Sequence, residues 1–176
     1  DPDSSVKSLH PDNASVAREI LRAVGCSDVQ IDEWSQTFTA PKYRQEVVTV
    51  WATTWINDGC ASTPISTIYA IESFPGADIL IIGGMDRWLD LTALVSTIEA
   101  HEVDCVYCYS ETGKAIAAAL QKKTFTHETL KEILDTLRDK DLTGKQVLFS
   151  PWAPSYDQFA SMVERGEVFD SLIRET

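Results

Sequence analysis

Residues 79–82 constrain the fold more than any other part of this chain, because they read Ile-Leu-Ile-Ile and are followed at once by two glycines. A short, continuous apolar run of this kind is typical of a strand that is buried on both faces. Strands buried on both faces belong to parallel sheets, in which helical crossovers cover the two sides. The run therefore predicts an α/β domain with a parallel sheet.

The rest of the chain alternates between strand and helix patterns as such a domain requires. β-branched and aromatic runs predict strands, and apolar residues at a helical period predict helices. The expected strands are 46–51, 53–56, 79–82, 103–109 and 146–149, and the expected helices are 12–24, 29–38, 64–73, 91–100, 112–120, 127–137 and one that begins at Ser155. Ser155 and Gln158 have the spacing of a capping box. We expect a Rossmann-like, mostly parallel sheet with helices on both faces.

Charge and composition restrict the partners of the chain. Its 176 residues include 15 lysines and arginines against 27 aspartates and glutamates, which gives a net charge of −12. A chain this acidic lacks the basic surface of a nucleic-acid binder and would be repelled by anionic lipid. No apolar run approaches the roughly 20 residues of a membrane-spanning helix. We expect a cytoplasmic protein that binds neither nucleic acid nor membrane, and nothing in the sequence indicates its oligomeric state.

Cysteines and histidines predict no metal site and no redox site. Cys105 and Cys108 have the spacing of a Cys-x-x-Cys motif, which would need a turn to bring the two sulfurs together. They lie in an expected strand, where residues three apart point to opposite faces. The histidines are scattered: His10, His101 and His127. We therefore expect reduced, structural cysteines in a cytosolic protein.

Polar, chemically rich segments follow four of the expected strands. In open α/β sheets, ligands bind at the carboxyl ends of the strands. The segments are 57–64, 83–87, 110–114 and 150–155. Each alone is ordinary turn or cap chemistry, and Gly113-Lys114 does not complete a phosphate-binding loop, because Ala115 follows the lysine. Together they predict a crevice that binds a small anion at helix starts.

The same segments, in the same order, resemble motifs of the Mur ligases. The resembling stretches are 10–14, 43–46, 55–64, 83–87 and 148–159 with 164–166, and the last of these is the most specific. From about Leu9 to Arg174 the chain resembles the C-terminal domain of this family, most closely the branch that adds D-glutamate. Residues 10–176 would form that domain, with 10–40 as a helical lead-in from a central ATPase domain. Residues 1–9 would be a linker or a remnant of an expression vector, and the chain a fragment of a longer protein.

The resemblance implies a ligase of peptidoglycan synthesis, and hence of cell-wall formation, cell shape and division. In this family ATP phosphorylates the carboxylate of UDP-N-acetylmuramoyl-L-alanine, and the amine of D-glutamate attacks the acyl phosphate. Mg²⁺, the phosphate-binding loop and most of the nucleotide-sugar site would be held by other domains. This chain would supply substrate contacts, no catalytic residue and no metal ligand, and would be inactive alone.

The resemblance also implies site residues. Asn13, Arg44 and Asp58 fall at positions that contact the nucleotide, and Asp58 would accept the ribose hydroxyls. The residues expected at D-glutamate are Ser62, Arg87, Ser155, Tyr156 and Met162. Arg87 stands where the family has a carboxylate-binding lysine, and the N–H groups of Ser155 and Tyr156 would take the other carboxylate at a helix start.

Departures from the family pattern leave two alternatives open. Cys60 replaces a lysine, Ser62 a threonine, and Met162 an aromatic residue, so the amino acid that is added is not fixed by the sequence. One alternative is a non-catalytic or repurposed Mur-like module. The other is an unrelated flavodoxin-like or nucleotide-binding α/β domain, which a bound flavin or dinucleotide would support.

Overall fold

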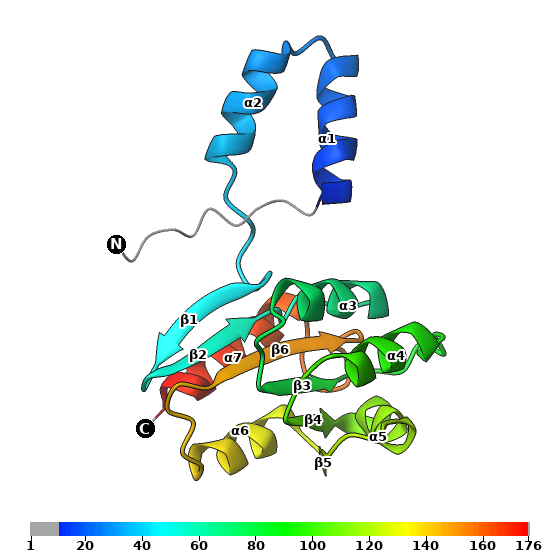
Figure 1. The fold of residues 1–176 in the computed structure, drawn as a ribbon, viewed down its shortest axis with the longest axis vertical. Helices are drawn as coiled ribbons and strands as arrows, with labels where there is room; N and C mark the ends of the chain where they lie inside the picture. The colour runs from blue at the N-terminus through cyan, green and yellow to red at the C-terminus, as the bar shows by residue number, and fades with distance from the viewer. Residues whose placement is uncertain (1–10, 176) are drawn as a thin grey trace. The chain divides into compact units, whose positions relative to one another are not determined.

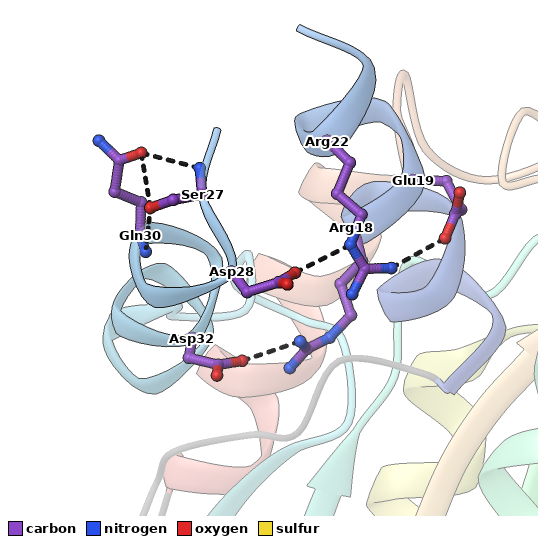
Figure 2. Close-up of polar contacts among 7 residues, drawn as sticks. All are labelled: Arg18, Glu19, Arg22, Ser27, Asp28, Gln30 and Asp32. Atoms are coloured by element: carbon purple, nitrogen blue, oxygen red, sulfur yellow. Dashed lines mark hydrogen bonds and ion pairs between the residues drawn. The ribbon is translucent and has the colours of Figure 1, made fainter. Parts of the chain in front are cut away.

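The computed structural model describes residues 11–175 and divides into two compact units, with the boundary between residues 41 and 42. The first unit contains helices α1 (Pro11–Ala23) and α2 (Asp28–Thr37). Ser27 caps α2 through a capping box, in which its N–H donates to Oε1 of Gln30 at 3.0 Å (Figure 2). Ion pairs of 2.9 Å join Arg18 to Asp32 and Arg22 to Asp28 across the two helices. Polar contacts therefore hold this helical pair together.

Most of the apolar residues that set the helical period of this segment are exposed. Val16 and Ile20 in α1 and Val24 just after it are exposed, whereas Leu21 is half-buried. The helix was correctly predicted by this pattern, to within a residue at each end. The 1–9 linker and His10 lie outside the described residues.

The second unit is built on a six-stranded sheet. Its strands are β1 (Glu46–Val50), β2 (Thr53–Asn57), β3 (Ile79–Gly83), β4 (Cys105–Tyr109), β5 (Thr124–His127) and β6 (Gln146–Trp152), in the order β1-β2-β6-β3-β4-β5. Neighbouring strands are parallel except for β1 and β2, which form an antiparallel hairpin. The predicted α/β fold with a mostly parallel sheet is confirmed.

Helices cover both faces of this sheet (Figure 1). The helices are α3 (Pro64–Ser73), α4 (Thr92–Ala100) and α5 (Ser110–Ala119) on one face, and α6 (Leu130–Arg138) and α7 (Met162–Arg174) on the other. Strand β3 shows why both faces must be covered. Leu80 and Ile82 join the core under α3–α5, whereas Ile79 and Ile81 join the core under α6 and α7. By the same alternation, Cys108 lies in the first core and Cys105 packs against the second, as predicted.

The hairpin between β1 and β2 turns on two residues with left-handed backbone. Trp51 has φ 53° and Ala52 has φ 59°. A two-residue connection with positive φ at both positions is a type I′ turn, which normally carries Asn-Gly because other residues are strained there. Trp51 and Ala52 therefore carry backbone strain, which could not be predicted from the sequence pattern.

Replacing Ala52 by glycine is expected to stabilise the chain by about 0.5–1 kcal/mol. Glycine removes the left-handed penalty, and part of the gain is offset by its greater freedom in the unfolded state. The measurement is urea denaturation. The matched control is Ala118→Gly on the exposed side of α5, which should lose about 1 kcal/mol. Destabilisation by both substitutions would contradict the turn assignment.

Two segments differ from the sequence prediction. Strand β5 was not predicted, and His127 ends it rather than beginning a helix. The last helix begins at Met162, capped by Ser161, and not at Ser155. Ser155 instead opens a turn, in which its carbonyl accepts from the N–H groups of Gln158 and Phe159. Over residues 11–175, no helix is long and apolar enough to cross a membrane.

Candidate functional site

The sheet topology marks one edge as the place for a ligand. After β3 the chain moves outward through β4 and β5, and it then returns so that β6 lies between β2 and β3. The carboxyl ends of β3 and β6 therefore flank the point where the direction of strand addition changes, which is where open α/β sheets bind ligands. The N–H of Met85, after β3, donates to the carbonyl of Pro154, after β6, at 2.8 Å. The two loops meet at this edge.

Arg165 fixes the backbone beneath the site. This side chain from α7 is 0% exposed. Its Nε donates to the carbonyl of Gly59 at 2.9 Å, and one terminal nitrogen donates to that of Ala61 at 2.8 Å. The other terminal nitrogen donates to the carbonyl of Ala153 at 2.7 Å. A single guanidinium thus ties the loop after β2 to the loop after β6, and sequence reasoning missed this role.

Asn57 and two glycines complete this framework. The side-chain amide of Asn57 donates to the carbonyl of Gly166 at 2.9 Å, and its oxygen accepts from the N–H of Gly59 at 3.0 Å. A Cβ on Gly166 would collide with the ring of Tyr43. Close approach of Tyr43 to α7 therefore requires glycine at position 166, so the Arg-Gly pair of the sequence motif serves the framework.

Asp58 is a buried acid with two hydrogen-bond partners. It is 5% exposed. One carboxylate oxygen accepts from the hydroxyl of Ser150 at 2.7 Å, and the other accepts from the N–H of Gln45 at 3.2 Å. Burial raises the pKa of Asp58 to about 7, although both hydrogen bonds and the charges of Arg44 and Arg165 lower it. Near neutral pH this carboxyl exists in both protonation states.

The predicted nucleotide residues are only partly brought together. Arg44 is exposed and close enough for its charge to act on Asp58. The neighbouring Gln45 N–H binds Asp58 directly. Asn13 lies in α1, within the first unit, so its distance from Arg44 and Asp58 is not defined. Arg44 provides a cation and Asp58 provides a hydrogen-bond acceptor. Each carboxylate oxygen of Asp58 accepts one hydrogen bond and keeps a second lone pair.

The residues predicted to bind D-glutamate lie on the loops of this same edge. Ser62 follows β2 and is half-buried, Arg87 follows β3 and is exposed, and Met162 opens α7 with an exposed side chain. Ser155 is buried and Tyr156 is exposed, both after β6. Their N–H groups do not lie at a helix start, because α7 begins at residue 162. The predicted helix start at Ser155 is therefore wrong, and these two residues lie in a turn.

Cys60 lies between the two predicted subsites. It is buried, and its Sγ lies 3.8 Å from the carbonyl oxygen of Lys42 and 4.0 Å from that of Met162. Burial raises the pKa of the thiol. The side chain therefore acts as a small neutral group that packs the loop after β2 against the start of α7.

The loop after β3 holds Arg87 free of intramolecular ion pairs within the described residues. Asp86 accepts from the N–H of Trp88 at 2.8 Å, and Asp90 accepts from the N–H of Thr92 at 2.9 Å. Both neighbouring carboxylates are thus engaged in local turns rather than with the guanidinium. Trp88 is 92% exposed and has φ 57°. An unpaired arginine in a loop shaped by two aspartates can bind an anion.

No cluster of three or more His, Cys, Asp or Glu side chains suited to a metal ion occurs among residues 11–175.

Comparisons with known proteins relate this chain to one group of ligases. It is 31% identical over 179 residues to UDP-N-acetylmuramoylalanine–D-glutamate ligase of Lactobacillus johnsonii, covering 98% of this chain and 39% of the relative. It is 32% identical over 165 residues to the enzyme of that name from Chlorobaculum tepidum, covering 92% of this chain and 33% of the relative. No family model matches the chain.

Solved structures show the same fold. The MurF structure from Acinetobacter baumannii superposes with a TM-score of 0.70 over 92% of this chain and 36% of that one, at 17% identity. The chain thus has an α/β fold that is also found in a Mur ligase, and its sequence is similar to part of the D-glutamate ligases. The relatives reported above are D-glutamate ligases, and the chain spans well under half of their length.

Proposed function

We propose that this chain is the C-terminal substrate-binding domain of an ATP-dependent ligase that adds D-glutamate to UDP-N-acetylmuramoyl-L-alanine. The observation that carries the proposal is the similarity to D-glutamate ligases over 98% of the chain. The sheet edge supports it, because the loops after β2, β3 and β6 place cationic and polar groups where such a sheet binds ligands. The complete protein would be cytoplasmic and would act in cell-wall synthesis.

The reaction needs an activated carboxylate and a positioned amine. ATP supplies the phosphoryl group that converts the carboxylate to an acyl phosphate, with ADP released. The amine then attacks the acyl carbon, and phosphate leaves as the amide forms. Residues of this chain orient the partners and keep water away from the acyl phosphate. Mg²⁺ would be held mainly by other parts of the protein, so no step is assigned to it.

Arg44 and Asp58 are proposed to bind the nucleotide. Arg44 is exposed and would contact the nucleotide as a cation. Asp58, when ionised, would accept the ribose hydroxyls with lone pairs that Ser150 and Gln45 leave free. Asn13, in α1, is likewise proposed to contact the nucleotide.

The amino-acid end is formed around Arg87. Its guanidinium, free of ion pairs within residues 11–175, would take one carboxylate of D-glutamate as a fork of two donors. Ser62 and the N–H groups of Ser155 and Tyr156 would hold the remaining oxygens. Neither of these two N–H groups donates to a backbone carbonyl in the described chain, and Met162 would border the side chain of the amino acid.

The test of the proposed function is an amide-ligation assay of the full-length protein with ATP, the nucleotide sugar and a panel of amino acids. We expect product with D-glutamate and phosphate release that depends on it. The isolated 176-residue chain should turn over no ATP, because no phosphate-binding loop is recognisable in it. Magnesium-dependent ATP turnover by the purified chain, or preference for another amino acid, would contradict the assignment.

Replacing Arg87 by alanine in the full-length protein is expected to raise the KM for D-glutamate by roughly 30- to 1000-fold, the effect of losing a charge-assisted, bidentate contact. The KM for ATP should change little, because the proposed nucleotide residues Arg44 and Asp58 lie on other segments, before β1 and after β2. Arg87→Lys is the matched control and should be milder, since it keeps the charge. Steady-state kinetics with each substrate varied make the measurement. A D-glutamate KM within about threefold of the parent would rule out the anchor role.

A non-catalytic Mur-like module is the second candidate, and Cys60 is the observation that favours it. The thiol is buried, and its pKa is raised, where the family motif has a lysine. The position therefore provides no cation near the phosphate end. A Gly-x-x-x-x-Gly-Lys-[Ser/Thr] loop in the sequence upstream would favour the ligase.

A further inference from the structure

Two buried hydroxyl groups connect Asp58 to helix α3. Thr67, in α3, and Ser150, in β6, are both 0% exposed. The hydroxyl oxygen of Thr67 lies 3.0 Å from the carbonyl oxygen of Ser150 and 2.9 Å from its hydroxyl oxygen. The hydroxyl oxygen of Ser150 lies 2.7 Å from Oδ2 of Asp58. These three side chains therefore form one buried hydrogen-bond network.

The number of hydrogens in this network determines which protonation state it fits. The three contacts need three O–H hydrogens, whereas the two hydroxyls supply one each. The carbonyl of Ser150 can only accept, so the hydrogen of Thr67 is used there. The hydrogen of Ser150 then points to the oxygen of Thr67, and the third hydrogen must come from the carboxyl of Asp58. Neutral Asp58 completes the network, because its O–H donates to Ser150 and its other oxygen accepts from the N–H of Gln45.

The ionised form of Asp58 leaves the same network one hydrogen short. Ser150 must then donate to the carboxylate, and Thr67 has to share its single hydrogen between two oxygens of Ser150. A carboxylate in this position gains most from a further donor, because hydrogen bonds to a charged acceptor are the stronger ones. The hydroxyls of a ribose are donors of that kind.

The charged and titratable groups around Asp58 hold the two forms close in free energy. Burial favours the neutral carboxyl, whereas the charges of Arg44, before β1, and Arg165, in α7, favour the carboxylate, and the pKa of Asp58 is about 7. The thiol of Cys60 is sensitive to the charge of Asp58, but burial raises its own pKa and it stays neutral. A ligand that binds only the carboxylate can therefore change the protonation of Asp58 near neutral pH.

We propose that the hydroxyls of Thr67 and Ser150 keep a proton on Asp58 before the nucleotide binds, and that the ribose hydroxyls of the nucleotide displace this proton. The O–H bond of Asp58 breaks, its proton passes to the solvent, and Ser150 turns its hydrogen to the carboxylate. The inference rests on the nucleotide contact proposed for Asp58. It makes Thr67 a positioning residue, because a side chain that is 0% exposed can act on the nucleotide only through Ser150 and Asp58.

The first test is a titration of the Asp58 carboxyl in the 176-residue chain by ¹³C NMR, with Asp58→Asn to assign the signal. The parent should titrate at about pH 7. Thr67→Val removes the acceptor of the Ser150 hydrogen, which can then donate to Asp58, so the midpoint should fall by about one pH unit. Thr67→Ser keeps the hydroxyl and should keep the parent midpoint. An unchanged midpoint in Thr67→Val, or an equal fall in Thr67→Ser, would overturn the inference.

The second test is calorimetric titration of the full-length protein with ADP at about pH 6 and about pH 8, in two buffers of different ionisation enthalpy. Asp58→Asn corrects for the titration of ADP itself. Relative to that variant, the parent should bind roughly tenfold more tightly at pH 8 than at pH 6, because Asp58 is then mostly ionised. At pH 6 the parent should release a proton on binding. Thr67→Val should bind more tightly than the parent at pH 6 and equally at pH 8, a gain that damage to the fold would not produce.

The outcomes separate the inference from the proposed function. If the parent binds ADP no more tightly than Asp58→Asn at pH 8, the nucleotide contact of Asp58 is wrong, and the inference is wrong with it. If the parent binds more tightly at pH 8 than Asp58→Asn but releases no proton at pH 6, the nucleotide contact stands and only the inference is overturned.

Discussion

Replacing Arg165 by alanine is expected to cost about 3–5 kcal/mol of unfolding free energy, a large part of the 5–15 kcal/mol typical of a domain. The guanidinium donates to the carbonyls of Gly59, Ala61 and Ala153, all within 2.9 Å. Without it, three carbonyl oxygens lose a charged donor in a buried place, and the loops after β2 and β6 lose their common tie. Urea denaturation at constant pH measures the loss.

Two further variants make that expectation specific. Arg165→Lys should recover only part of the stability, because one ammonium cannot span three carbonyls fixed by a planar fork. Arg174→Ala removes an arginine from the same helix that is 54% exposed and pairs with Asp170 at 3.6 Å, and it should cost at most about 1 kcal/mol. If Arg165→Ala also lowers the unfolding free energy by less than about 1 kcal/mol, water replaces the guanidinium at the three carbonyls. The framework role would then be wrong.

The fold followed from the sequence wherever a segment is buried on both faces or carries a cap. Residues 79–82 gave β3 because neither face of that strand meets water. Helix α3 begins at Pro64 where the sequence predicted it, and its first turn is capped by Thr63. Strand β5 escaped prediction because it has four residues at the sheet edge and alternates threonine with Phe125 and His127. Its strand character comes from pairing with β4, which is tertiary context.

The start of the last helix shows where local pattern was misleading. Ser155 and Gln158 have capping-box spacing, but the Gln158 side chain binds elsewhere: its oxygen accepts from the N–H of Leu130 at 3.2 Å and its amide donates to the carbonyl of Glu128 at 3.0 Å. Ser161 and Glu164 have the same relation three residues apart, and they cap the helix. Two candidate boxes compete in the sequence, and long-range bonds decide between them.

The sequence predicted which loops carry the candidate site, but it did not predict the framework that holds those loops together. The strand ends predicted the edge that carries Arg87, Ser62 and Ser155. Arg165 entered the sequence prediction only as part of the motif at 164–166, because an arginine in a helical segment gives no sign of three backbone acceptors. The buried side of α7 is formed by Arg165, Phe169, Leu172 and Ile173, whereas Met162 and Val163 are exposed. The roles of the predicted site residues stay predictions.

The stability of the chain is expected to fall as the pH rises from about 4 to about 7, by roughly 4 kcal/mol at most from Asp58 alone. Its pKa is about 7 in the folded state, against 3.8 in the unfolded chain. Between those values the unfolded state has lost the proton that the folded state keeps, so each increment of pH favours unfolding. The contribution is fully favourable below the unfolded pKa and is lost as the pH passes the folded one.

Asp58→Asn should remove most of this dependence, since asparagine is neutral at every pH and can still bond Ser150 and Gln45. Urea denaturation at about pH 5 and about pH 8 should show the parent losing roughly 3 kcal/mol between them and the variant losing little. Carboxyls whose pKa is lowered, such as Asp78 beside Lys145 and Asp135 beside Lys131, titrate below this window and act in the opposite direction. Parallel pH profiles for parent and variant would show that Asp58 stays ionised when buried.

In the full-length protein the same variant should raise the KM for ATP, because only the ionised carboxylate is a strong acceptor for ribose hydroxyls.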